Sequence, residues 1–82
     1  MYYLYILLCA DNSLYTGMTN NVEHRLWNHR NGSGSMYVHD RLPIRLVYVE
    51  TYADKYIAAQ RERQIKGWKR QKKIEILHLN LT

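Results

Sequence analysis

The chain opens with an apolar stretch that sets the pattern for its first half. Residues 2–9 are apolar or aromatic throughout, without the alternation of polar and apolar positions that a half-exposed strand shows. This pattern is typical of a strand buried on both faces, and hence of a central strand. Residues 11–13 (Asp-Asn-Ser) are a turn signal, and residues 14–18 then fit the second strand of a hairpin.

The length of the hairpin turn decides which side chains share a sheet face. A two-residue loop would turn Tyr5 and Tyr15 to opposite faces. A three-residue loop pairs Cys9 with Tyr15 and puts both tyrosines on the same face as Gly17. We favour the three-residue loop because Asn12 tolerates the left-handed backbone conformation that such a loop needs.

After the hairpin the periodicity changes to that of a helix. Polar N-cap residues precede a helix expected from about 21 to 31, and Gly32 is a natural stop after it. Arg25 and His29 are four residues apart, so they lie on one face of this helix, beside its apolar stripe. Residues 32–43 are expected to form a polar loop.

The second half of the chain contains one strand and two helices. Residues 44–51 are rich in strand formers, and helices are expected over about 53–66 and 70–78, separated at Gly67. The order is therefore ββαβαα, which indicates an α+β domain. The length and the absence of a linker or repeat predict a single domain over residues 1–82.

Charge and cysteine content indicate the kind of partner and the cellular compartment. The net charge is +5, and seven of the twelve basic residues lie between Arg61 and Lys73. Such a run is either a solvated helix face or a surface for a polyanion such as nucleic acid. The single cysteine, Cys9, cannot form an internal disulfide, which favours a reducing cytoplasm. No apolar run is long enough to span a bilayer, so no membrane partner is expected.

Five polar side chains fall near apolar faces and form the candidate site: Tyr5, Tyr15, Arg25, His29 and Glu62. Phosphodiester cleavage needs a base to activate water, a cation to hold the phosphate and a carboxylate to hold a metal. This set contains each part. From spacing alone the simpler alternatives stay open: strand tyrosines with one hydrogen bond each, an interior histidine, and surface ion pairs for Arg25 and Glu62.

The same residues carry a family resemblance. Leu4-Tyr5-Ile6 and Tyr15-Thr16-Gly17 resemble the two halves of the GIY-YIG signature. The segment from Arg25 to His29 resembles the R-x-x-x-H helix of that family, and Glu62 resembles its metal-binding glutamate.

Three further segments are similar to hallmarks of the small stand-alone GIY-YIG proteins of bacteria: residues 9–17, 43–48 and 65–68.

The resemblance implies a fold and an activity. The fold is a three-stranded antiparallel sheet with the first strand central, flanked by helices. The activity is metal-dependent hydrolysis of nucleic-acid phosphodiesters, with DNA favoured over RNA. A tyrosine would help to deprotonate water, Arg25 would steady the phosphate, and Glu62 would hold Mg²⁺ or Mn²⁺. We expect the hydroxyls of Tyr5 and Tyr15 to open on a cleft beside Arg25 and His29.

Further expectations concern the substrate and the pathway. Five residues are expected to contact the substrate: Gly17, Lys66, Lys69, Arg70 and Lys73. Similar domains occur in an incision subunit of nucleotide-excision repair, which suggests DNA repair. The chain has no separate DNA-reading domain, so a protein partner is a candidate source of specificity.

Two alternatives to a nuclease stay open. Residues 34–39 lack the lysine, threonine and arginine of the related G-A-K-Y-T-R loop, which favours a binding module with weak or no turnover on the same fold. The third interpretation is a structural domain with a core around Ile6, Leu46, Val47 and Ile65. Trp27 and Trp68 are expected to be packing residues, and Cys9 a small buried hydrophobe.

Overall fold

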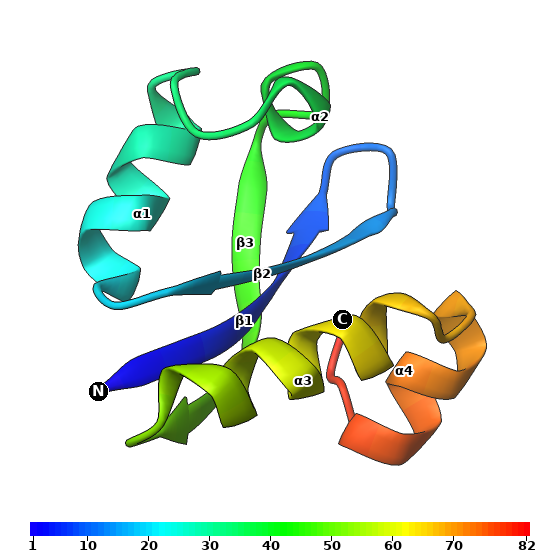
Figure 1. Ribbon diagram of the computed structural model, residues 1–82. Helices are drawn as coiled ribbons and strands as arrows, with labels where there is room; N and C mark the ends of the chain where they lie inside the picture. Colours follow the sequence, from blue (N-terminus) through cyan, green and yellow to red (C-terminus); the bar gives the residue numbers. More distant parts are fainter.

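The chain folds around a three-stranded antiparallel sheet. The computed structural model describes residues 1–82 and contains β1 (Tyr2–Cys9), β2 (Leu14–Thr19) and β3 (Ile44–Tyr52), arranged in the order β2-β1-β3. The central place of β1 (Figure 1) confirms the prediction made from its unbroken apolar sequence.

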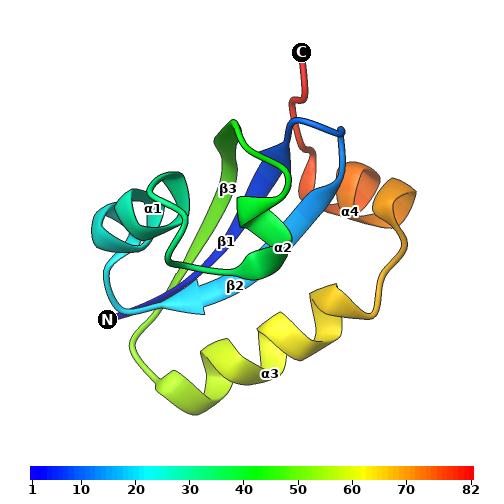
Figure 2. The same cartoon turned by 90° about the horizontal axis from the view of Figure 1, so that it is seen from above.

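Four helices flank the sheet: α1 (Val22–Arg30), α2 (Met36–His39), α3 (Lys55–Lys66) and α4 (Arg70–Leu77). Figures 1 and 2 show α1 and α2 on one side of the strands and α3 and α4 on the other. None of these helices combines the length and the apolar character that crossing a bilayer requires.

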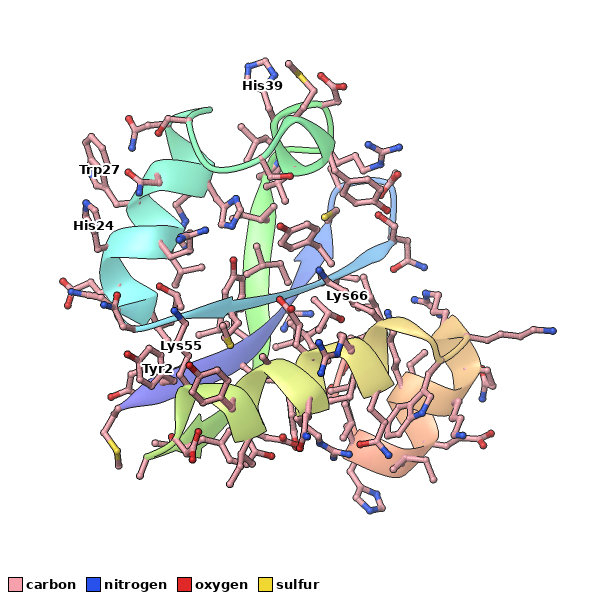
Figure 3. The ribbon with its side chains drawn as sticks, viewed as in Figure 1. Tyr2, His24, Trp27, His39, Lys55 and Lys66 are labelled. Carbon is pink, nitrogen blue, oxygen red and sulfur yellow. The ribbon has the colours of Figure 1, made fainter.

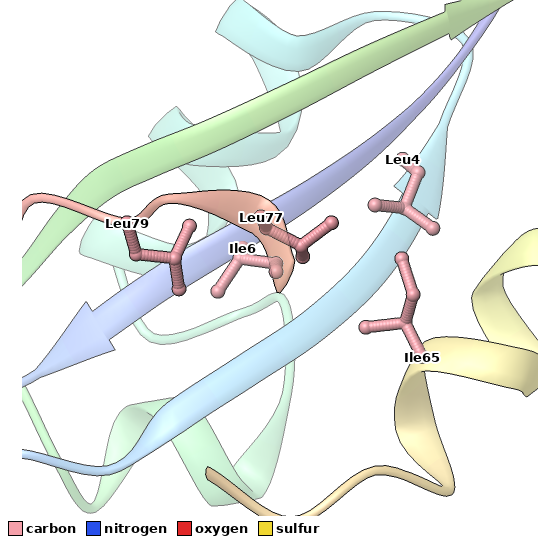
Figure 4. Close-up of a cluster of buried hydrophobic side chains, with 5 residues drawn as sticks. All are labelled: Leu4, Ile6, Ile65, Leu77 and Leu79. Carbon is pink, nitrogen blue, oxygen red and sulfur yellow. The ribbon is translucent and has the colours of Figure 1, made fainter. Parts of the chain in front are cut away.

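Successive residues of β1 supply the two cores, one on each face of the sheet. Leu4 and Ile6 point to α3 and α4, where they pack with Ile65, Leu77 and Leu79 (Figure 4).

Tyr5 and Leu7 point to the opposite face and pack with Val38 of α2. Because side chains alternate along a strand, one apolar run can serve both cores. The buried Tyr5 is thereby held on the face that α1 and α2 cover.

The helices begin and end largely as predicted. The Asn21 side chain accepts a hydrogen bond of 3.0 Å from the His24 N–H and caps α1. Gly32, with φ +80°, lies just beyond the Asn31 C-cap. At α3 the Asp54 carboxylate accepts from the Tyr56 N–H at 2.7 Å.

The hairpin register corrects one prediction and confirms another. Tyr5 lies opposite Gly17 and Leu7 opposite Tyr15, so the predicted pairing of Cys9 with Tyr15 is wrong by two residues. The Cys9 N–H instead donates to the Ser13 carbonyl at 2.9 Å, leaving a three-residue loop in which Asn12 has φ 70°. A shift of two residues preserves the sheet face, so both tyrosines share the face of Gly17 as predicted.

Two features were not predicted. Residues 36–39 form the one-turn helix α2 inside the expected loop, because Val38 is drawn into the core beside Tyr5 and Leu7. Trp27 is wrongly predicted as a packing residue, since it is 61% exposed, whereas Trp68 packs against the core. Cys9 is buried, as predicted.

An ion-pair cluster ties α3 to β3. Glu50 accepts hydrogen bonds from Tyr48, from Tyr52 at 2.5 Å, and from the Nε and one terminal nitrogen of Arg61 at 3.0 Å each. The bidentate Arg61 outweighs the burial of the carboxylate and, with the two phenols, lowers the pKa of Glu50 to about 2. Arg61 is thereby engaged in holding the fold.

Candidate active site

The centre of the site is a buried pair from the first strand and the first helix. The Tyr5 hydroxyl lies 2.9 Å from Nε2 of His29, and each residue is 1% exposed. His29 reaches Tyr5 from the last turn of α1 because the helix runs along the face of the sheet on which Tyr5 lies.

Two glycines make room for this pair. A Cβ at Gly17 would lie 2.5 Å from the Tyr5 hydroxyl oxygen, and a Cβ at Gly34 would lie 2.5 Å from Nδ1 of His29. Both distances are far below van der Waals contact, so each glycine lets the backbone approach the ring beneath it. Nδ1 of His29 has no hydrogen-bond partner in this packing.

Tyr15 completes an aromatic cluster at the surface end of the pair. Its ring lies 6.4 Å from the Tyr5 ring and 5.4 Å from the His29 ring, the latter edge-on. Tyr15 is half-buried and its hydroxyl has no hydrogen-bond partner within the chain. Its oxygen is therefore free to meet water or substrate, whereas that of Tyr5 is occupied.

Charges from two helices act on the buried phenol. Burial raises the pKa of Tyr5 above its ordinary value, Tyr15 and the Glu62 carboxylate raise it further, and Arg25 opposes them. Burial also lowers the pKa of His29, and the positive charge of Arg25 lowers it further. At neutral pH the pair is therefore a protonated phenol beside a neutral imidazole.

Glu62 comes from α3, on the other side of β2 from α1. Its side chain is 21% exposed and its only ionic partner is Lys66, one turn further along, at 3.6 Å. Tyr5, Tyr15 and His29 are thus in direct contact, and the charges of Arg25 and Glu62 both act on Tyr5, that of Glu62 from the helix on the other side of the sheet.

The predicted cleft is not present at this cluster. The Tyr5 hydroxyl points into the interior toward His29, and none of the three surface hollows is lined by either tyrosine. The correction has a physical cause: Gly17 and Gly34 let the backbone close over the two rings.

The predicted substrate-contacting residues occupy different environments. Gly17 is buried under Tyr5, Lys66 pairs with Glu62, and Lys69 is exposed just before α4. Arg70 donates to the backbone oxygen of Asn12 at 3.0 Å.

Lys73 is only 8% exposed, and burial together with Lys66 lowers its pKa. Lys66, Lys69 and Arg70 therefore stay candidates for phosphate contact, and Lys73 does not.

Sequence reasoning missed a residue next to Tyr15. The Tyr37 ring stacks on the Tyr15 ring at 5.9 Å with a 28° tilt, and the Arg41 guanidinium lies 3.7 Å from the centre of the Tyr37 ring. Arg41 is fixed by Asp11 at 2.9 Å and by the Tyr37 carbonyl at 3.0 Å. Tyr37 lies in α2 and Arg41 lies beyond its C-cap, so no periodic pattern in the sequence indicated their contact.

Comparison with known proteins shows the family to which this chain belongs. The model of the GIY-YIG catalytic domain matches residues 1–75. The chain belongs to the GIY-YIG family. A UPF0213 protein of Staphylococcus haemolyticus is 46% identical over 76 residues, which are 93% of each chain. One of Clostridium perfringens is 47% identical over 77 residues, covering 94% of this chain and 83% of the relative.

A solved GIY-YIG relative has the same fold. The solution NMR structure of a UPF0213 protein from Bacillus halodurans superposes with a TM-score of 0.62 at 38% identity, covering 95% of this chain and 84% of that one. The resemblance to small stand-alone GIY-YIG proteins and the α+β fold are thus confirmed. The GIY-YIG domain places the chain in a nuclease superfamily.

Proposed function

We propose that this GIY-YIG domain is a nuclease that hydrolyses phosphodiester bonds of nucleic acid, DNA in the first place, with the help of a divalent metal ion. The observation that carries the proposal is the convergence of Tyr5, Tyr15, Arg25, His29 and Glu62 from β1, β2, α1 and α3. Such a set supplies a base, a phosphate-binding cation and a metal-binding carboxylate.

In this proposal Tyr15 first loses its own hydroxyl proton to solvent, and its phenolate then accepts the proton of the attacking water and returns to the phenol. Its hydroxyl is free and reaches the surface, whereas the Tyr5 hydroxyl is bonded to His29. Tyr5 and His29 hold the aromatic cluster rigid and contribute a polar, water-poor environment beside Tyr15. Arg25 binds the phosphate and stabilises the negative charge that develops on it.

Glu62 fits a weakly held divalent ion. It is a partly exposed carboxylate, and no three His, Cys, Asp or Glu side chains gather to form a full metal cage. Mg²⁺ is commonly held by one or two carboxylates, with water and substrate phosphate as its other ligands. When bound, it supplies Lewis-acid polarisation of the phosphate and stabilises the leaving oxygen. Lys66, which pairs with Glu62 at 3.6 Å, would then be available to contact phosphate.

A second candidate is a nucleic-acid-binding module without turnover. The closed packing of Tyr5 and the absence of a hollow at the cluster favour it. One experiment separates the two: incubation of the pure protein with single-stranded, duplex and branched DNA and with RNA, in Mg²⁺, in Mn²⁺ or in EDTA. A nuclease cleaves at least one substrate only when metal is present. Binding without cleavage across the whole panel supports the module.

A further inference from the structure

Trp27 is the one tryptophan that does not pack against the core. It is 61% exposed, and no aromatic or cationic side chain lies against its ring. Trp68, in contrast, packs on the core and lies 5.4 Å from Arg61 and 5.0 Å from Lys72. Figure 3 shows Trp27 beside His24 on the outer flank of α1, directed away from the sheet. Trp68 therefore has a role in packing, whereas Trp27 has none.

A hollow of about 480 Å³ lies at this flank, lined by Asn21, Glu23, His24 and Trp27. Three of its four lining residues are polar. The Asn21 oxygen is used by the His24 N–H, which leaves the amide NH₂ as a donor, the Glu23 carboxylate is an acceptor, and the His24 ring has nitrogens of both kinds. An indole face with donors and acceptors beside it matches a nucleobase and its polar edge. The negative charge of Glu23 disfavours a phosphate at the same place.

The hollow lies on the same helix as the candidate site. Trp27 is two residues from both Arg25 and His29, so it is about 200° around α1 from them. A helix with its side chains is only about 10–12 Å wide. A strand whose phosphate contacts Arg25 therefore reaches the outer flank within a few nucleotides. In a duplex both faces of each base are already stacked, so only an unpaired base is available to lie on Trp27.

We propose that Trp27 and His24 form a stacking site for an unpaired nucleobase of the substrate strand, so that this domain binds single-stranded or partly unpaired nucleic acid in preference to duplex. The inference rests on the proposed function for the identity of the polymer, and it adds the class of substrate. The net charge of +5 provides the general attraction to such a polyanion, and the stacking site provides the selectivity.

The test measures binding in EDTA, so that it is independent of cleavage. Wild type, Trp27→Ala and Trp27→Phe are titrated with a labelled single-stranded oligo(dC) and with a blunt duplex of the same length. Trp27→Ala should weaken single-strand binding by about 5- to 150-fold, the range for loss of one stacked base. Trp27→Phe, which keeps a ring, should restore most of the affinity, and duplex binding should stay unchanged.

A matched control and a direct signal accompany these titrations. Ile57→Ala removes another half-exposed apolar side chain, on α3, and should leave both affinities unchanged. In a Trp68→Phe protein, whose only tryptophan is Trp27, fluorescence should be quenched when oligo(dC) binds and should stay constant with duplex.

Each outcome supports or overturns the stacking site independently of the nuclease proposal. Unchanged single-strand affinity in Trp27→Ala, equal loss of single-strand and duplex affinity, or unquenched fluorescence at saturation overturns the stacking site, whether or not the wild type cleaves. Quenching together with selective loss of single-strand binding supports it, even if no substrate is cleaved. A wild type that binds neither oligonucleotide also overturns the stacking site. The nuclease proposal is then tested by the cleavage experiment alone.

Discussion

The Tyr5 hydroxyl lies 2.9 Å from Nε2 of His29, which joins the central strand to the first helix across 24 residues of sequence. Both rings are buried, and the backbone at Gly17 and Gly34 closes over them. The geometry of the candidate site thus depends on close packing around this one pair.

Gly17→Ala should destabilise the protein by about 1–3 kcal/mol and reduce any nuclease activity, because the new Cβ would overlap the Tyr5 ring. Tyr5 has no room to yield, since its hydroxyl is held by His29. Urea unfolding measures the change. The matched control is Gly67→Ala, whose nearest atoms are backbone oxygens at 3.5 and 3.8 Å. It should be neutral or stabilising by up to about 1 kcal/mol. Equal effects of the two substitutions would show that Tyr5 is not tightly packed.

His29 should make stability fall as the solution is acidified. Its pKa in the folded protein is lowered by burial, so below about pH 6.5 the unfolded chain takes up a proton that the folded chain resists. The free energy of unfolding should therefore decrease from pH 7 to pH 5. His29→Gln should be less stable at pH 7 and should lose part of that decrease. The other three histidines are exposed and stay the same in both proteins. Parallel pH profiles in the two proteins would show that folding leaves the pKa of His29 unchanged, contrary to its burial.

Glu50 should govern stability at lower pH without affecting the chemistry. Its folded pKa of about 2 lies well below the ordinary value of 4.5, so its stabilisation is present above about pH 4.5 and is lost as the pH falls toward 2. The shift corresponds to roughly 3 kcal/mol. Glu50→Gln should lower the free energy of unfolding at pH 7 by a similar amount and flatten the profile between pH 4.5 and 2. A variant as stable as wild type at pH 7 would mean that the Arg61 pair contributes nothing.

Tyr37 should affect cleavage through Tyr15. Removing the stacked ring with Tyr37→Ala leaves Tyr15 without its neighbour and should slow cleavage by roughly 10- to 100-fold, the cost of a small misplacement of a reacting group. Tyr37→Phe keeps the stack and should behave as wild type. Tyr56→Ala removes a tyrosine that is 79% exposed and serves as the control. If Tyr37→Phe is as slow as Tyr37→Ala, the hydroxyl and not the stack is the important part.

Much of the fold could be predicted from local patterns. The unbroken apolar run of β1 indicated a central strand, and its alternate residues do serve two cores. Asn21 and Gly32 marked the ends of α1 because capping depends on single residues. The shared face of Tyr5 and Tyr15 followed from the parity of the register, even though the exact pairing was wrong by two residues.

The parts that escaped prediction depend on contacts between distant segments. Helix α2 exists because Val38 is drawn into the core beside Tyr5, which no local pattern in that loop reveals. The burial of Lys73 was visible in its i,i+4 spacing from Leu77, yet its charge favoured a surface position. Trp27, opposite Arg25 on the helix, was likewise readable as exposed.

The decisive measurement is cleavage by Glu62→Gln beside wild type, on the substrate that the wild type cleaves best, with Mg²⁺ and with EDTA. The substitution keeps the shape of the side chain and removes the charge that is needed to hold the ion. Glu75→Gln, an exposed glutamate of α4 bonded to Gln71 at 2.9 Å, is the matched control.

If the five-residue cluster is a metal-dependent nuclease site, Glu62→Gln falls to the metal-free level while Glu75→Gln cleaves as wild type. Binding of Glu62→Gln in EDTA is then unchanged or tighter, because one negative charge is gone. Equal Mg²⁺-dependent cleavage by wild type and Glu62→Gln would contradict the assignment of Glu62 and, with it, the proposed site.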